Sequence, residues 1–182
     1  MKRQLRAGEP TSWALAWKAC LMATNGGASR FRRLFSRSNA APLDPARIDL
    51  EVVASSFDDA ESASSALARA GDSGRWNAEQ ETVFRHHLVL PSDTVEDAVA
   101  TAAQDGYVLV DAPSPMPTVP DSVYRGDVAN GADVTLQRVQ VIDALHISQE
   151  RSRMAGLAQR RGGIVTGWDA LQPGADSASA AD

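Results

Sequence analysis

Cysteine is nearly absent from this sequence, since Cys20 is the only one among 182 residues. A single cysteine excludes an internal disulfide framework and a paired-cysteine zinc site. No apolar run approaches the roughly 18 residues that a membrane-spanning helix needs. Glycine pairs occur at Gly26-Gly27 and Gly162-Gly163, but they lack the lysine and the flanking pattern of a phosphate-binding loop. The sequence therefore predicts neither a membrane span nor a P-loop nucleotide site.

Charge is distributed unevenly along the chain. Residues 1–40 contain eight basic residues and one acid, Glu9, which gives a net charge of +7. Residues 41–182 contain ten basic and 22 acidic residues, which gives a net charge of −12. A body this acidic repels nucleic acid and favours basic partners. We therefore separate a basic, flexible arm (1–45), a folded domain (46–171) and a disordered tail (172–182).

The basic arm allows several interpretations. Its apolar run Trp13–Trp17 stops at Lys18, whereas the apolar region of a signal peptide needs about 7–15 residues. If residues 30–37 are helical, they place apolar side chains on one face and arginines on the other, which suits contact with RNA or an anionic membrane. The alternative is a solvated tail. Met22 is a second candidate start, and if translation begins there, residues 1–21 are a mis-called extension.

Periodicity in the body predicts an alternation of strands and helices. Residues 48–57 fit a strand or a helix equally well, and 58–70 predict a helix with Asp58, Asp59 and Glu61 in its first turn. Four prolines between 112 and 133 exclude a helix or an inner strand there. The further predictions are strands over 82–90, 107–111, 134–141 and 163–168, a helix capped by Ser92 that ends at Gly106, and a helix over 147–161.

From Thr82 onward the order is strand, helix, strand, loop, strand, helix, strand. This order is typical of an α+β, ferredoxin-like βαββαβ sandwich with a four-stranded antiparallel sheet. The segment before it adds a helix, or a strand and a helix. The apolar positions change parity within 134–141, which predicts a bulge near Gln137-Arg138.

The histidines do not form a recognisable metal site in the sequence. His86 and His87 are neighbours on a strand, so their side chains point to opposite faces and cannot chelate one ion together. His146, near the start of a predicted helix, could approach either of them, which defines a hypothetical site of two histidines with a carboxylate such as Asp143, but the spacing matches no familiar ligand pattern. We expect His86 to be a hydrogen-bonded core residue and His87 to lie on the outer face. Cys20 has no histidine near it in sequence, and no catalytic set emerges, so we expect no enzyme, metal or cofactor.

Aromatic residues are also scarce, at 5% of the sequence. The predicted strands carry Phe84 and Tyr107, but no pair of aromatics at the spacing that stacks RNA bases. With an acidic body, this predicts no direct binding of nucleic acid by the folded domain.

Four short motifs follow one another in the second half of the sequence. They are a His-His-Leu strand, an alanine-rich helix followed by Gly-Tyr-Val-Leu-Val-Asp, a helix with Leu-Ala near its end, and a last strand ending in Gly-Trp. In this order they resemble the RraB family, the regulators of ribonuclease E activity. The similarity covers 82–169, although the family's Tyr-Asp before Gly-Trp is Val-Thr here. We expect the two glycines to serve backbone geometry and Tyr and Trp to pack. The motif residues are His86, His87, Leu88, Gly106, Tyr107, Asp111, Gly167 and Trp168.

The resemblance implies a cytoplasmic, non-catalytic protein that binds ribonuclease E and inhibits or modulates its RNA cleavage. An acidic domain of this kind would occupy arginine-rich segments of the nuclease. A second hypothesis is a ferredoxin-like adaptor for another protein, with the basic arm contacting membrane or RNA. Candidate partner-binding residues, for which capping and solubility are the alternative roles, are Asp93, Glu96, Asp97 and Asp105.

Overall fold

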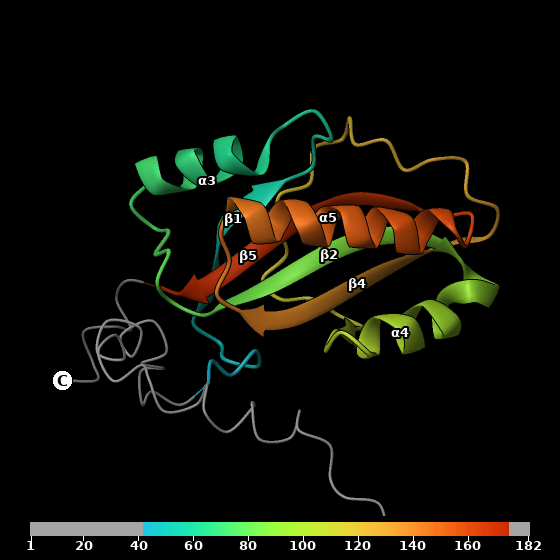
Figure 1. Ribbon diagram of the computed structural model, residues 1–182, viewed down its shortest axis with the longest axis horizontal. Helices are drawn as coiled ribbons and strands as arrows, with labels where there is room; N and C mark the ends of the chain where they lie inside the picture. The colour runs from blue at the N-terminus through green and yellow to red at the C-terminus, as the bar shows by residue number, and fades with distance from the viewer. Residues whose placement is uncertain (1–41, 175–182) are drawn as a thin grey trace, which may run out of the picture. The chain divides into compact units, whose positions relative to one another are not determined.

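The computed structural model describes residues 42–174, which form an α+β fold with a five-stranded antiparallel sheet and three helices (Figure 1). The strand order is β1-β5-β2-β4-β3. The basic arm up to residue 41, including its amphipathic segment, and the tail from residue 175 lie outside the described residues. The elements are β1 (Leu50–Ser56), α3 (Ala63–Asp72), β2 (Thr82–Pro91), α4 (Val95–Ala103), β3 (Val108–Val110), β4 (Gly131–Gln140), α5 (Ala144–Gln159) and β5 (Ile164–Pro173).

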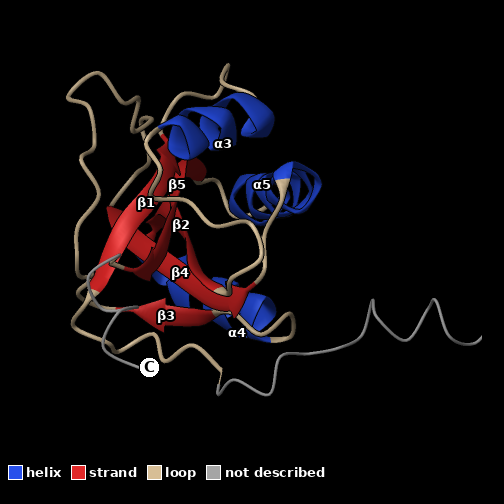
Figure 2. Ribbon diagram, turned by 90° about the vertical axis from the view of Figure 1, so that its left-hand side faces the viewer, coloured by secondary structure: helices blue, strands red, loops and turns tan. Residues whose placement is uncertain are grey.

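The three helices lie on one side of the sheet, and the long loop between β3 and β4 runs along the other side (Figure 2). Side chains alternate between the two faces of a strand. On β2, Phe84 packs in a cluster with α3 and the start of α5, while Leu88 and Leu90 pack in a second cluster with α4 and the rest of α5. The helix-side core therefore consists of two clusters along β2, with the ring of His86 between Phe84 of the first and Tyr107 of the second.

A smaller apolar cluster on the opposite face explains the change of parity in β4. The pairing of β2 with β4 is continuous from Thr82–Gln140 to Pro91–Gly131, so the predicted bulge near Gln137-Arg138 is wrong. Val139 instead packs on the second face, beside Val83. The apolar positions change parity because each end of the strand buries a different face.

The sheet has five strands rather than the predicted four because β1 pairs with β5. The ambiguous segment 48–57 forms a strand, and β5 continues to Pro173 instead of ending at Trp168. The β1–β5 pairing extends from Leu50–Pro173 to Ser56–Trp168. The second half of β5 thus gives β1 its strand partner.

The helix starts differ from the predicted ones for reasons of capping. Ser62 caps α3 by accepting a hydrogen bond from the backbone N–H of Ser65, so Asp58, Asp59 and Glu61 precede the helix. Asp58 instead accepts from the N–H of Ala60 in a local turn. Residues 92–94 form a short 3₁₀ turn before α4, and Ser92 makes no capping bond. At α5, the cap is Asp143, which accepts from the N–H of His146.

Candidate functional site

A buried polar cluster lies at the centre of the sheet face that the long loop covers. Arg85 on β2 donates from Nε to both carboxylate oxygens of Asp169 on β5, at 3.0 and 3.1 Å, and Nη2 bonds the same carboxylate. The Arg85 and Asp169 side chains are 2% and 0% exposed. The two residues are direct partners in the β2–β5 register. A buried charge is tolerated when it is paired and hydrogen-bonded, and this pair meets both conditions.

His87 extends the same cluster toward β4 and the molecular surface. Its Nε2 lies 2.6 Å from Oδ1 of Asp169, and its Nδ1 lies 3.2 Å from the Thr135 hydroxyl. The His87 side chain is 13% exposed, and its ring centroid is 5.5 Å from that of Phe57. The prediction that His87 lies on the face opposite His86 is confirmed, because only His86 packs in the helix-side core.

The proline-rich loop between β3 and β4 covers this cluster. The carbonyl oxygen of Pro115 accepts a 2.7 Å hydrogen bond from Nη2 of Arg85, and Pro117 is buried. No helix or strand forms between residues 111 and 130, as the spacing of the prolines predicted. The loop therefore supplies a hydrogen-bond acceptor for a buried guanidinium N–H group that the sheet alone would leave without one.

His86 lies on the helix side and is fully buried. Its ring packs edge-on to Phe84, with centroids 4.6 Å apart, and lies 5.8 Å from the ring of Tyr107. Within residues 42–174, neither ring nitrogen has a hydrogen-bond partner, so the predicted hydrogen bonding of this core histidine is wrong. Burial lowers the pKa of His86 to about 3, with smaller contributions from nearby positive groups, which keeps the ring neutral.

Tyr107 connects the end of α4 to α5 through a second buried polar contact. Its hydroxyl donates a 3.0 Å hydrogen bond to Oε2 of Glu150, whose other oxygen lies 3.3 Å from Nη2 of Arg138. The Arg138 guanidinium carbon is 5.0 Å from the Tyr107 ring centroid, a cation–π contact. Burial, reinforced by the charge of Glu150, raises the pKa of Tyr107. The motif tyrosine packs in the core as predicted and holds a buried carboxylate as well.

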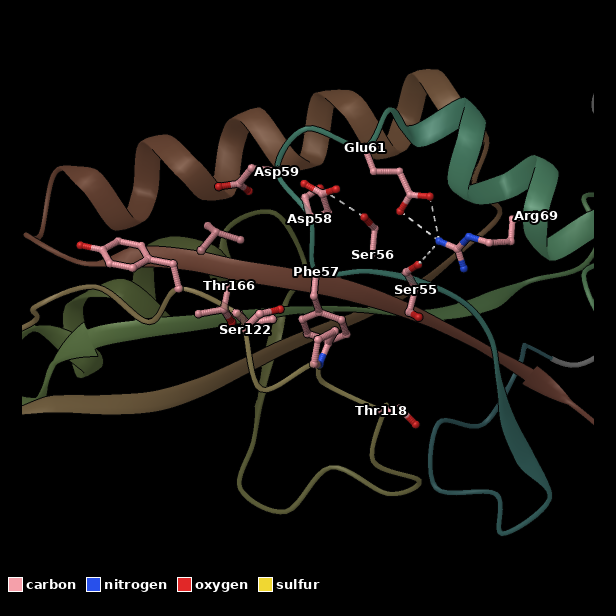
Figure 3. Close-up of a pocket in the computed structure, with 14 residues that line it drawn as sticks. Ser55, Ser56, Phe57, Asp58, Asp59, Glu61, Arg69, Thr118, Ser122 and Thr166 are labelled. Carbon is pink, nitrogen blue, oxygen red and sulfur yellow. Dashed lines mark hydrogen bonds and ion pairs between the residues drawn. The ribbon is translucent and has the colours of Figure 1, made fainter.

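A hollow of about 580 Å³ opens where β1 ends (Figure 3). The last β1–β5 pair is Ser56–Trp168, so Ile164–Gly167 of β5 have β2 on one side and no strand on the other. Figure 3 shows Asp58, Asp59 and Glu61 on one side of β5, and Thr118 and Ser122 on the other. The groove therefore follows an open strand edge, between the turn after β1 and the proline-rich loop.

The carboxylates on the acidic side of the groove differ in their ion pairing. Burial raises the pKa of Glu61, but hydrogen bonds from Ser56 and Arg69 outweigh this effect and hold the pKa below its usual value. The Glu61–Arg69 ion pair measures 2.9 Å. Asp58 and Asp59 are exposed and form no ion pair with another described residue. The groove thus presents negative charge toward solvent.

The candidate acids of α4 and its ends are all exposed, but they are not equivalent. Asp97 pairs with Arg161 at 2.6 Å, and Asp105 pairs with Arg153 at 2.8 Å. Asp93 and Glu96 form no ion pair with another residue of the described range. Two of the four predicted contact residues therefore have carboxylates available to a partner.

The remaining motif residues divide between the core and the surface. Leu88 and Trp168 are buried in the helix-side core. Gly106, in the turn after α4, has a φ of +81°, which agrees with the predicted role of this glycine in backbone geometry. Gly167 is instead required by close packing, because a Cβ there would lie 2.3 Å from Cδ1 of Phe57. Asp111 is exposed.

Sequence reasoning missed the polar cluster because its two most buried members carry no motif. Arg85 lies inside the predicted strand 82–90, and Asp169 lies one residue beyond the predicted end of the last strand. The available signal was an arginine inside a strand of otherwise apolar and histidine residues. Such a position requires a counter-charge on a neighbouring strand.

The hypothetical metal site does not assemble in residues 42–174, where no three histidine, cysteine or carboxylate side chains come together. His146 pairs with Asp143 at 2.9 Å on the surface, whereas His86 is buried in the core. The helices of the described range are also all too short or too polar to cross a bilayer.

Comparisons with protein-family models, with curated proteins and with solved structures found no match to this chain. The family assignment therefore stays a prediction that depends on the order and spacing of the motifs.

Proposed function

We propose that this chain is a ferredoxin-like, non-catalytic regulator of the RraB kind, which binds ribonuclease E and lowers or modulates its RNA cleavage. The fold proposal is supported by the strand order β5-β2-β4-β3 within 82–173, with β1 as an added edge strand. In this order each half contributes a strand, a helix and a strand, and the two first strands are central neighbours.

The observation that carries the functional proposal is that the chemically reactive side chains bond one another inside the domain. His87, Arg85 and Asp169 bond one another beneath the loop, and Tyr107 bonds Glu150 in the core. These groups hold strands, helices and the loop together, and none of them lines the groove at the end of β1. This arrangement supports a protein that acts by occupying another protein's surface.

Surface charge indicates the chemistry of the partner. Residues 42–174 contain ten arginines, no lysine and twenty acids, a net charge of −10. Thirteen of the twenty acids form no ion pair with an arginine of this range, and all of these except Asp143, which pairs with His146, remain available to a basic partner. The seven acids that pair with an arginine are Asp49, Glu61, Asp97, Asp105, Asp133, Glu150 and Asp169.

The test is an inhibition and binding assay with purified full-length protein and ribonuclease E. We expect cleavage of a fluorogenic RNA to slow as the protein is added, and binding to weaken as NaCl rises from about 50 to about 300 mM, because salt screens exposed charges. Asp93→Asn/Glu96→Asn tests the free acids of α4. A protein that neither binds nor slows the nuclease at low salt contradicts the proposal.

A further inference from the structure

We propose that the groove beside β5 binds an extended, basic segment of a partner protein, which adds to the sheet as a strand along Ile164–Gly167. The inference rests on the proposed protein-binding function and names the surface responsible for it. The starting observation is the difference in length between two paired strands, because β1 ends opposite Trp168 while β5 begins at Ile164. An open strand edge presents N–H and C=O groups to which an extended peptide can bind.

The chain after β1 keeps this edge open. Phe57 packs directly on Gly167, where a Cβ would lie 2.3 Å from its ring and 2.7 Å from the carbonyl oxygen of Ser56. The chain then turns away at Asp58 into the turn before α3. Within the described residues, no backbone hydrogen bond joins the proline-rich loop to Ile164–Gly167. The edge is therefore bordered on both sides but paired by neither.

A β-bulge alters β5 at this position. The pairs His87–Gly167 and Leu88–Val165 leave Thr166 as an extra residue, and its hydroxyl donates to the carbonyl oxygen of His87 at 3.1 Å. Bulges of this kind are common beside binding sites, where they redirect side chains and interrupt pairing. The extra residue of the bulge, Thr166, therefore lies at the open edge and is hydrogen-bonded to the backbone of His87, a member of the buried cluster.

The lining of the groove indicates a segment with alternating apolar and basic side chains. Phe57, Val123 and Val165 supply apolar surface, and Tyr124 at the same groove is 77% exposed. Asp58 and Asp59 supply the negative charge. Successive residues of a strand point to opposite sides, so one set of side chains would meet the apolar surface and the other the acids.

Charge complementarity selects this occupant over others. A nucleic-acid strand or an acidic peptide would be repelled by a domain with a net charge of −10 and by Asp58 and Asp59, the two groove carboxylates that no arginine of the described residues neutralises. The folded domain of a second copy would bring the same negative surface to the contact. A basic peptide neutralises that charge while its backbone pairs with β5.

The test uses fluorescence anisotropy with the full-length protein and a fluorescein-labelled peptide of alternating arginine and valine. We expect Asp58→Asn/Asp59→Asn to weaken binding roughly three- to tenfold at low salt, since exposed ion pairs each contribute modestly. The amide oxygen of an asparagine at position 58 can still accept the hydrogen bond from Ala60, so the local turn is retained. The matched control, Asp72→Asn/Glu79→Gln, removes the same charge from two exposed acids that do not line the groove and should change the affinity less than about twofold. A glutamate–valine peptide should not bind.

Amide chemical-shift changes locate the bound peptide. We expect them to concentrate at Phe57, Val165 and Thr166. Equal affinity in wild type and Asp58→Asn/Asp59→Asn, or shifts that centre on β3, overturns the proposal. Analytical sedimentation provides a further test. If it shows dimers that dissociate when the peptide is added, the strand edge binds a second copy of this chain and the proposal is overturned.

The same variants separate this inference from the proposed function. If ribonuclease E binds wild type and Asp58→Asn/Asp59→Asn equally well, the groove assignment is wrong while the regulator proposal stands. If the arginine–valine peptide behaves as expected but ribonuclease E does not bind, the regulator proposal is wrong and the groove serves another basic partner.

Discussion

At the scale of single residues, the pair formed by Arg85 and Asp169 is the most constrained interaction in the described structure. Both side chains are almost completely buried, and the pair also bonds His87 and the carbonyl of Pro115. A buried ion pair adds little stability compared with apolar packing, but removing one partner leaves an uncompensated charge. The fold therefore tolerates the two buried charges together, but not one of them without the other.

Asp169→Asn should lower the free energy of unfolding by about 3–5 kcal/mol, because Arg85 would remain buried without its counter-charge. Urea denaturation measures the loss. The control is Asp133→Asn, which breaks an exposed pair with Arg125 and should cost less than about 1 kcal/mol. Similar losses in both variants would contradict the buried role of Asp169.

His86 predicts a specific pH dependence of stability. Its pKa in the folded state is about 3, whereas an unfolded histidine has a pKa of about 6.5, so the unfolded chain binds more protons between these values. The His86 contribution is fully present above about pH 6.5 and decreases as pH falls toward 3. From pH 7 to about pH 5 we expect a loss of roughly 2 kcal/mol in the free energy of unfolding.

The His86 prediction is tested by urea denaturation at both pH values. His86→Leu should flatten the dependence between pH 7 and about 5, because leucine does not ionise. His146→Gln serves as the control, since the His146 side chain is 54% exposed. An unchanged pH dependence in His86→Leu would show that another group is responsible.

At the scale of elements, the end of β1 packs closely against β5, and this contact determines the shape of the groove. Gly167 has no room for a side chain between Phe57 and Ser56. This position shows why a glycine occurs in the middle of a strand, where it otherwise weakens pairing. The motif Gly-Trp thus combines a close backbone contact with a buried aromatic.

Gly167→Ala should destabilise the protein by about 1–3 kcal/mol, because the new Cβ overlaps the ring of Phe57 and the carbonyl of Ser56. Thermal or urea unfolding measures the change. Gly71→Ala is the matched control: the site lies within α3, a Cβ there has no neighbour within 4 Å, and alanine should stabilise by up to about 1 kcal/mol. Tolerance of Gly167→Ala would contradict the packing argument.

Elements were more predictable from the sequence than the contacts between them. The strand over 82–90 and the helix α5 could be identified because their apolar side chains repeat with the period of a strand and of a helix, and Ile147, Met154 and Leu157 all face the core. The sequence does not specify the fifth strand, because residues 48–57 fit the period of a strand and that of a helix equally well. The Arg85–Asp169 pair depends on the register of two strands 84 positions apart, which local patterns do not specify.

At the scale of the whole molecule, the sheet has a protected centre and two exposed edges. β2 pairs with both β4 and β5 over most of its length, whereas β3 has three residues and a single neighbour. Opening free energies within one protein vary with burial and pairing. The edges, including the open end of β5, are therefore the regions where local opening requires least disruption.

Hydrogen exchange followed by mass spectrometry should show this gradient. We expect the amides of β2 to exchange most slowly and those of β3 to exchange fastest among the strands, by a factor of about 100 or more. Peptides from α3 provide an internal comparison, since this helix packs on β1 at an edge of the sheet. Equal protection of β2 and β3 would contradict the strand order described here.

The placement of β5 has a consequence for synthesis on the ribosome. β1 leaves the exit tunnel early, but its only strand partner in the described structure is the last strand made. Pairings between distant segments form late because a long loop must close first. The nascent domain therefore carries an unmatched strand until β5 has left the exit tunnel, and a ribosome that stalls while β5 is still inside the tunnel displays a chain that cannot complete its sheet.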